Sequence, residues 1–112
     1  MERTLNELQS DVHKWASQFE HPYFSPLSMM AAMTEEVGEV ARVINSEYGD
    51  KKKKDGEYIK NLEEELGDLL FSICCMANDQ SVSLTDAMDK KFDKLYKRDN
   101  NRFKRKEENE NK

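Results

Sequence analysis

The sequence predicts an all-α fold: four main helices per chain in an antiparallel helical bundle that is completed by homo-oligomerisation. Apolar residues recur every three or four positions along four separate stretches of the 112-residue chain. Hydrophobic residues make up 37% of the chain and charged residues another 37%, which is little apolar material for a self-sufficient core. We therefore expect one helical domain over residues 1–103, a disordered charged tail over 104–112, and further copies of the chain to complete the core.

The first helix is expected over residues 5–19. Thr4 is a suitable N-cap, and Glu7 lies three positions later, as in a capping box. Trp15 lies at the edge of the apolar stripe, where a tryptophan either joins the core or stacks on a nucleobase. The segment 21–26 contains two prolines and must interrupt the helix.

The second helix is expected over residues 26–48, because Ser25 and Pro26 form a typical N-cap and N1 pair and Gly49 is a typical terminator. Its apolar stripe consists of Met30, Met33, Val37, Val40, Ala41 and Ile44. The following segment, 49–56, contains four consecutive lysines. A solvated connector explains them, and contact with phosphates is the alternative.

The third helix is expected over residues 57–79, and its broad apolar stripe indicates that it is the central helix. The short connector makes the second and third helices antiparallel neighbours. The fourth helix begins near Leu84, with Ser83 as its cap, and Arg102 and Phe103 extend its pattern. Its apolar positions are Met88, Phe92 and Leu95.

Two acidic pairs stand out on the second and third helices: Glu36 with Glu39, and Glu65 with Asp68. Residues three apart share one side of a helix, with their Cβ atoms about 5–6 Å apart. Two such pairs on packed helices bring four carboxylates together, and these repel one another and are costly to desolvate. Mg²⁺ is the divalent cation that such oxygen ligands favour, and Mn²⁺ can substitute for it.

Other features narrow the class of protein. The longest apolar run is too short to cross a bilayer, and the N-terminus lacks the apolar region of a signal peptide. Cys74 and Cys75 are adjacent and poorly placed to bond each other, so we expect reduced thiols. These observations predict a cytoplasmic protein without membrane association. The net charge of −5 argues against a general nucleic-acid binder.

The charge is unevenly distributed along the chain. Residues 90–106 contain nine basic and two acidic residues, whereas the remainder is strongly acidic. Lys91, Lys94 and Arg98 lie on one flank of the fourth helix. A metal–phosphate ligand between an acidic and a basic region explains this pattern, and so does an ordinary solvated helix end favoured by the helix dipole.

The two acidic pairs carry a resemblance to a known family. The sequence reads Glu36-Val37-Gly38-Glu39, then a gap of 25 residues, then Glu65-Leu66-Gly67-Asp68. This arrangement resembles the ExxE…ExxD signature of the MazG-like nucleotide pyrophosphohydrolases, which belong to the all-α NTP pyrophosphatase superfamily. The resemblance extends over about residues 5–103.

The resemblance implies an activity and a set of functional residues. Such enzymes cleave an NTP or dNTP between its α and β phosphates, giving a nucleoside monophosphate and pyrophosphate, and they assemble as dimers or dimers of dimers. The implied Mg²⁺ ligands are Glu36, Glu39, Glu65 and Asp68. The implied phosphate-binding residues are Lys91, Lys94 and Arg98. Trp15 occupies the place of an aromatic residue that lies near the base.

The acidic and basic residues also suit phosphoryl transfer when they are considered without the family resemblance. Phosphoryl transfer depends on charge neutralisation and positioning more than on a covalent nucleophile. A carboxylate that the metal does not fully use can accept a proton from water, and Glu36 or Glu39 is our candidate. Lys91 and Arg98 would stabilise the pyrophosphate leaving group. The residue pattern by itself does not indicate which phosphorus is attacked.

Three alternatives remain to be weighed. Either acidic pair alone would be read as ordinary surface residues, but two pairs beside glycines at this separation favour a metal site. A di-iron carboxylate bundle needs Glu-x-x-His on two helices. The histidines, His13 and His21, lie outside the second and third helices, which argues against it. A non-enzymatic helical bundle that binds a nucleotide or a protein partner stays open.

Overall fold

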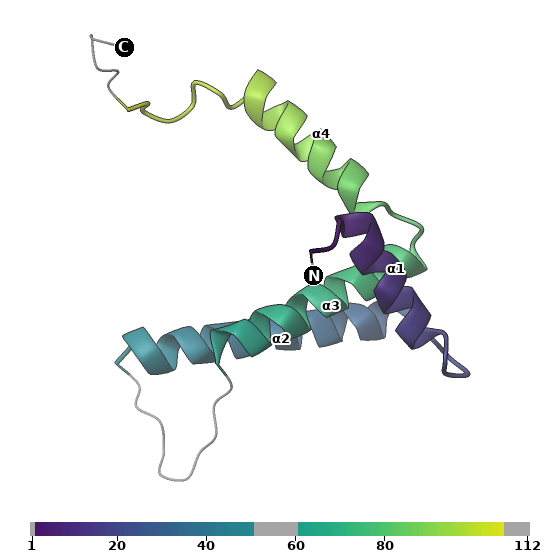
Figure 1. The fold of residues 1–112 in the computed structure, drawn as a ribbon. Helices are drawn as coiled ribbons and strands as arrows, with labels where there is room; N and C mark the ends of the chain where they lie inside the picture. Colours follow the sequence, from purple (N-terminus) through teal and green to yellow (C-terminus); the bar gives the residue numbers. More distant parts are fainter. Residues whose placement is uncertain (1, 51–60, 107–112) are drawn as a thin grey trace.

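The computed structural model describes residues 2–50 and 61–106, and four α-helices lie in this part of the chain (Figure 1). They are α1 (Leu5–Ala16), α2 (Pro26–Tyr48), α3 (Leu62–Asp79) and α4 (Leu84–Lys97). The all-α prediction is therefore confirmed. No helix among the described residues is long and apolar enough to cross a membrane.

Side-chain caps begin α1, α2 and α4 at the predicted places. Thr4 N–H donates to Glu7 Oε1 over 2.9 Å, and Glu7 N–H donates to Thr4 Oγ1 over 3.1 Å, which completes the capping box of α1. The bonds from the Thr4 backbone and side chain lower the pKa of Glu7. Ser25 caps α2 and Ser83 caps α4, each accepting a backbone N–H three residues later.

Two predicted helix boundaries are wrong. α1 ends at Ala16 rather than at residue 19, because Gln18 N–H and Phe19 N–H donate to Trp15 O and Ala16 O in a tighter turn. α3 begins at Leu62, since Asn61 has extended dihedrals and caps the helix with its side chain. The rest of the predicted start, together with the four lysines, falls in residues 51–60, outside the described part.

The C-terminal boundary also differs from the prediction. α4 ends at Lys97, and Arg98 is its cap, so Arg102 and Phe103 do not continue the helix. The predicted tail falls partly outside the described residues, which end at residue 106.

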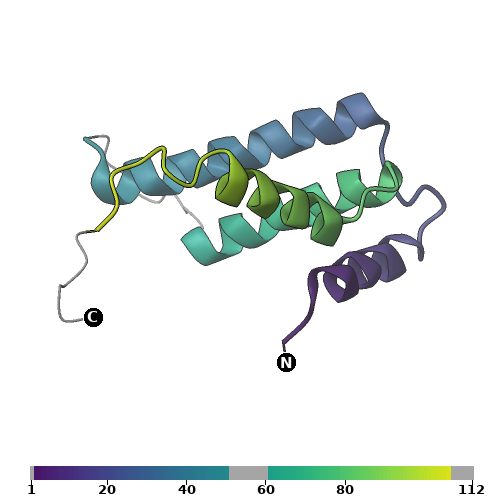
Figure 2. The same cartoon turned by 90° about the horizontal axis from the view of Figure 1, so that it is seen from above.

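α2 and α3 form an antiparallel hairpin, α1 packs on α3, and α4 packs on α1. Figure 1 shows α4 leaving the far end of α3 and pointing away from the hairpin, and in Figure 2 α4 lies over the hairpin rather than beside it. The Cα radius of gyration is 18.8 Å, compared with about 13 Å for a compact chain of this length. A single copy therefore does not close into a bundle.

The buried core of one chain is small. Its apolar members are Val12, Ala16, Met29, Val43, Cys74 and Ala77. Part of the apolar stripe of α2 is uncovered in the single chain, because Met30, Val37 and Ile44 are 39–52% exposed. α4 buries no residue, and its Phe92 is half exposed. Much of the apolar surface that the sequence assigns to a core is thus still uncovered.

A polar junction holds the N-terminal end of α4 to α1 and α3. The Gln9 side chain donates to Asn78 Oδ1 over 3.0 Å and to Val82 O over 2.9 Å, and its Oε1 accepts Leu84 N–H over 2.8 Å. Gln9 is only 9% exposed, so water replaces these bonds poorly. The junction therefore contributes to setting the direction in which α4 leaves the hairpin.

Candidate active site

The hairpin brings three of the four predicted metal ligands together. One carboxylate oxygen from each of Glu36, Glu65 and Asp68 lies within 4.8 Å of the others. Glu36 comes from α2, and Glu65 and Asp68 come from α3. The spacing suits a divalent cation held between the helices, because carboxylate oxygens are the preferred ligands of Mg²⁺.

Glu65 gives the clearest indication that this cluster has a ligand. The residue is 2% exposed, and its Oε2 atom is buried without a hydrogen-bond partner in the described structure. A buried carboxylate oxygen without a partner is costly, and a cation offsets that cost. The donor set therefore fits a hard divalent metal ion.

Glu39 does not belong to the close group. It lies one helical turn beyond Glu36, and the residue is exposed. Its position is three residues along the same flank of α2, so a side-chain rotation changes its distance to the cluster without moving the backbone.

The carboxylates of the cluster face inward because they lie in the rows of residues along which α2 and α3 contact each other. Met29, Glu36 and Val43 follow one another at intervals of seven on α2, and this row faces α3. On α3, Glu65 lies in the facing row. The carboxylates therefore occupy positions of the helix–helix contact that apolar residues fill elsewhere.

An aromatic pocket of about 440 Å³ lies further along the hairpin. Its lining includes Trp15, Phe19, Tyr23, Met29, Phe71 and Cys75. Phe71 and Cys75 follow Asp68 by three and seven residues on the same side of α3, which places the pocket up to about 10 Å from the acidic cluster. The same interval separates Met29 from Glu36 on α2.

Trp15 lies in this pocket, as the base-stacking alternative requires. The residue is 54% exposed and makes edge-to-face contacts with Phe19 and Phe71 at ring-centroid distances of 5.0 and 5.7 Å. It is therefore not a core tryptophan in this chain. Its ring is held by neighbours at its edge but remains accessible from solvent.

A hydrogen-bonded tyrosine borders the pocket, and the sequence reading did not identify it. Tyr23 Oη lies 2.7 Å from His13 Nδ1 and accepts a bond from Asn78 Nδ2 over 3.2 Å. Burial raises the pKa of Tyr23, so its hydroxyl stays protonated. No residue spacing marks Tyr23, because the contact joins α1, the segment before α2, and α3. Phe71 was detectable, since it follows Asp68 by one turn.

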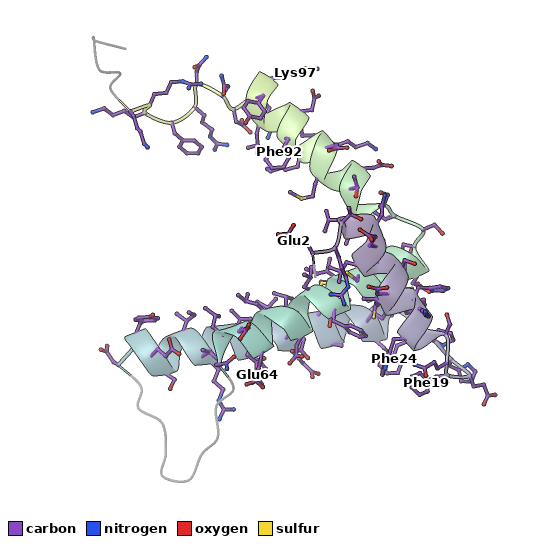
Figure 3. All side chains as sticks on the ribbon, viewed as in Figure 1. Glu2, Phe19, Phe24, Glu64, Phe92 and Lys97 are labelled. Carbon is purple, nitrogen blue, oxygen red and sulfur yellow. The ribbon has the colours of Figure 1, made fainter. Side chains whose placement is uncertain are left out.

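The predicted phosphate-binding residues are not brought to the cluster by their own chain. In Figure 3 the labelled Lys97 on α4 and Glu64 on α3 lie on separate arms of the molecule. Arg98 instead donates two bonds to Asp99, at 3.1 and 3.0 Å. These bonds raise the pKa of Arg98 and lower that of Asp99.

Comparison with known proteins identifies the family. Residues 24–103 match the MazG nucleotide pyrophosphohydrolase domain, a range that contains all three clustered carboxylates and the pocket residues Phe24, Met29, Phe71 and Cys75. The chain belongs to the MazG nucleotide pyrophosphohydrolase family. As a member it is a hydrolase, and the resemblance inferred from the two acidic pairs is confirmed.

Individual MazG relatives agree in sequence and in fold. YpjD of Bacillus subtilis is 47% identical over 107 residues, covering 96% of each chain. Its crystal structure superposes with a TM-score of 0.76 at 45% identity, over 85% of this chain and 97% of that one. The Bacillus-conserved MazG protein, a nucleotide pyrophosphohydrolase, gives a TM-score of 0.75 at 40% identity, over 87% of this chain and 94% of that one. iMazG from Vibrio DAT 722 gives 0.58 at 26% identity, over 86% and 99%.

Proposed function

We propose that this MazG-family chain is a Mg²⁺-dependent nucleoside triphosphate pyrophosphohydrolase. It cleaves an NTP or dNTP between the α and β phosphates and releases the nucleoside monophosphate and pyrophosphate. The observation that carries the proposal is the three-carboxylate cluster, with its buried and unpartnered Glu65 oxygen, beside an aromatic pocket. The carboxylate cluster provides the cation site that a triphosphate requires, and the aromatic pocket provides a site for the base.

The acidic residues have two roles, which are to bind the cation and to accept a proton from water. Glu36, Glu65 and Asp68 would hold Mg²⁺, or Mn²⁺ in its place, and Glu39 would complete the set if its side chain turned toward them. The ion would supply positive charge to offset and orient the triphosphate. Glu36 or Glu39 accepts the proton of the attacking water. Glu39 is favoured because its carboxylate lies outside the close group.

The pocket residues position the nucleoside. Trp15 stacks on the base, with Phe19 and Phe71 supporting its ring from the edge. The Tyr23 hydroxyl, fixed by His13 and Asn78, keeps the pocket wall in place. The distance along the hairpin of up to about 10 Å is suited to a nucleotide whose phosphates reach the cluster.

We further propose that the enzyme works in the cytoplasm as a homodimer or homotetramer and removes non-standard nucleotides from the pool. The uncovered apolar residues of α2 and α4 support the assembly. A substrate panel without preference for any modified base would count against the cellular role.

The deciding experiment measures pyrophosphate release from a panel of NTPs and dNTPs with Mg²⁺. Glu39→Gln removes one charge and keeps the side-chain shape, so we expect a loss of several orders of magnitude. Glu35→Gln is the matched control, because Glu35 is an exposed neighbour on α2 outside the cluster, and its activity should stay near wild type. Equal activity of Glu39→Gln and wild type would contradict the assignment of Glu39.

The same panel tests the alternative of a non-enzymatic binding module. If the wild-type protein releases no pyrophosphate from any nucleotide while calorimetry still detects Mg²⁺ and nucleotide binding, the binding module replaces the enzyme.

A further inference from the structure

We propose that Asn78 is a positioning residue that couples the aromatic pocket to α4, so that a nucleoside bound in the pocket and the junction that directs α4 stabilise each other. The nature of the ligand comes from the proposed function, on which this inference rests. Asn78 lies on α3, outside the pocket lining and outside α4. Its side chain nevertheless bonds to the pocket residue Tyr23 and to Gln9 of the junction.

The pocket and α4 lie at opposite ends of α1. In Figure 3 the pocket residues Phe19 and Phe24 lie beyond the C-terminal end of α1, whereas α4 leaves from beside its N-terminal end. α4 buries no residue of its own, so the hydrogen bonds of the junction contribute much of what holds its direction. The junction is therefore the place where the pocket can act on α4.

Hydrogen bonds join the junction to the pocket wall without a gap. Gln9 Nε2 donates to Asn78 Oδ1 over 3.0 Å, and Asn78 Nδ2 donates to Tyr23 Oη over 3.2 Å. Tyr23 lines the pocket, and its Oη lies 2.7 Å from His13 Nδ1. Gln9, Asn78, Tyr23 and His13 together form what we call the polar network.

The helices keep the members of the polar network beside the pocket. Phe71, Cys75 and Asn78 follow one another on α3 at intervals of four and three residues, so Asn78 continues the pocket side of this helix by one turn. On α1, Gln9 and His13 are four residues apart and share a side. Asn78 therefore stands on the same rigid helix as two pocket residues while it bonds to the junction.

Backbone groups fix the direction of the bonds at the junction end. Gln9 Oε1 accepts Leu84 N–H over 2.8 Å, and Gln9 Nε2 donates to Val82 O over 2.9 Å, so the Gln9 amide cannot turn over without losing both bonds. Asn78 Nδ2 donates to Gln9 O over 2.9 Å, which orients the Asn78 amide in the same sense. Asn78 can therefore only donate a hydrogen to Tyr23.

This direction fixes the hydrogen of Tyr23 and the tautomer of His13. Burial raises the pKa of Tyr23, so its hydroxyl keeps its hydrogen. Because Tyr23 Oη accepts from Asn78, its own hydrogen points to His13 Nδ1. The neutral imidazole of His13 then carries its hydrogen on Nε2, which lies 3.3 Å from Ser17 Oγ. A change of the Asn78 amide therefore changes the hydrogen bonds of the pocket wall.

The coupling acts in both directions. A nucleoside in the pocket packs against Tyr23 and holds the hydroxyl where Asn78 reaches it, and the Asn78 amide then keeps its bonds to Gln9. Gln9 is 9% exposed, so water poorly replaces a bond that is lost there. Because the two equilibria are linked, an intact junction raises the affinity for the nucleoside by the factor by which the nucleoside stabilises the junction.

Amide hydrogen exchange of the full-length protein, followed by NMR, tests the coupling. The probes are adenosine, guanosine, cytidine and thymidine, which lack phosphates and so require neither metal nor turnover, and Trp15 fluorescence reports their binding. We expect a bound nucleoside to slow exchange of Leu84 N–H, which bonds to Gln9 Oε1, by about 5- to 150-fold. Glu7 N–H, which bonds to Thr4 in the capping box of α1, is the control amide and should not respond.

Tyr23→Phe removes the oxygen that joins the pocket to Asn78 and keeps the ring. Exchange of Leu84 without ligand should stay as in wild type, because its bond to Gln9 does not involve Tyr23, but a bound nucleoside should no longer slow it. Tyr48→Phe, which removes an exposed hydroxyl at the far end of α2, is the matched control and should respond like wild type.

Three results of this experiment would overturn the proposal. They are a nucleoside effect of wild-type size in Tyr23→Phe, a wild type that binds a nucleoside without a change at Leu84, and a wild type that binds none of the four nucleosides. The proposed function is decided separately by pyrophosphate release, so its failure and the failure of the coupling are distinguishable.

Asn78→Asp provides a second measurement that needs no ligand. A carboxylate can only accept, so the Tyr23 hydroxyl should donate to it, and the imidazole of His13 should then carry its hydrogen on Nδ1. The ¹⁵N chemical shifts of the imidazole distinguish this tautomer from the Nε2–H form expected in wild type. A destabilised structure alone does not reverse a tautomer. An unchanged tautomer in Asn78→Asp would overturn the role of Asn78.

Discussion

At the scale of single residues, Glu65 is the side chain that the fold explains least without a ligand. The residue is 2% exposed, and its Oε2 atom has no partner in the described structure. A carboxylate is retained at a buried position when something other than packing requires it. The cation that we propose meets that requirement.

Glu65→Gln should therefore separate stability from metal binding. In a chelator, the variant should unfold at a higher temperature than wild type, because one of three neighbouring negative charges is gone. Mg²⁺ at a hundredfold excess over Kd should raise the free energy of unfolding of wild type by about 2.7 kcal/mol, and with it the unfolding temperature, and should leave the variant unchanged. Differential scanning calorimetry measures both. An equal Mg²⁺ shift in the two proteins would exclude Glu65 as a ligand.

Trp15→Ala tests the pocket. Loss of base stacking is worth about 1–3 kcal/mol, so KM should rise about 5- to 150-fold with a smaller change in kcat. Trp15 is the sole tryptophan, so nucleotide binding should also change the intrinsic fluorescence of the wild-type protein. Phe103→Ala, which removes an exposed aromatic ring outside the pocket, is the control. An unchanged KM in Trp15→Ala would remove Trp15 from the binding site.

At the scale of elements, the hairpin holds the acids and the junction directs α4. Three hydrogen bonds of one glutamine join α1 to the end of α3 and the beginning of α4. These hydrogen bonds are poorly exposed, so breaking them would leave polar groups without a partner or water. They therefore fix the angle at which α4 leaves α1 and α3.

Gln9→Met should lower the free energy of unfolding by about 1–3 kcal/mol, since the shape is kept but Val82 O and Leu84 N–H lose their partner. Activity should fall together with stability, because α4, which carries the proposed phosphate-binding residues, loses its fixed direction. Urea unfolding and pyrophosphate release measure the two effects. Gln18→Met is the control, because Gln18 is exposed and bonds only locally. A Gln9→Met protein with unchanged stability would show that the junction is dispensable.

At the scale of the whole molecule, one copy of the chain is extended and leaves apolar surface uncovered. Its radius of gyration exceeds that of a compact protein, and apolar side chains on α2 and α4 are exposed. Association that covers such rows is driven by the same burial of apolar surface that forms a core.

Val37→Lys should disrupt this association. Val37 lies between Met30 and Ile44 in the exposed apolar row of α2, and a lysine there would be buried without a partner charge in the assembly. We expect the sedimentation coefficient to fall toward that of a monomer at micromolar concentration, with at least tenfold weaker association. Lys14→Glu, a charge change on the exposed surface of α1, should leave the oligomer intact. A monomeric wild type would contradict the prediction of an oligomer.

The sequence by itself determined the helices, most of their caps and the family. Apolar spacing of three and four residues depends only on helix geometry, and a Ser, Thr or Asn before each helix bonds the free backbone N–H groups locally. For the same reason the two acidic pairs were readable, since residues three apart share a side of a helix in any fold. The same periodicity placed Trp15 at the edge of an apolar stripe, and it could also have placed Phe71 on the side of Asp68.

Only the tertiary structure decided which residues from different helices meet. It brought Glu36 to Glu65 and Asp68, left Glu39 outside the close group, built a pocket around Trp15 with Tyr23 as its wall, and directed α4 away from the acids. The same stripe of apolar residues predicts a core and an interface equally well, because both bury the same side chains. Whether a stripe lies in a core or in an interface depends on the long-range packing of helices, and periodicity along one chain carries no information about that packing.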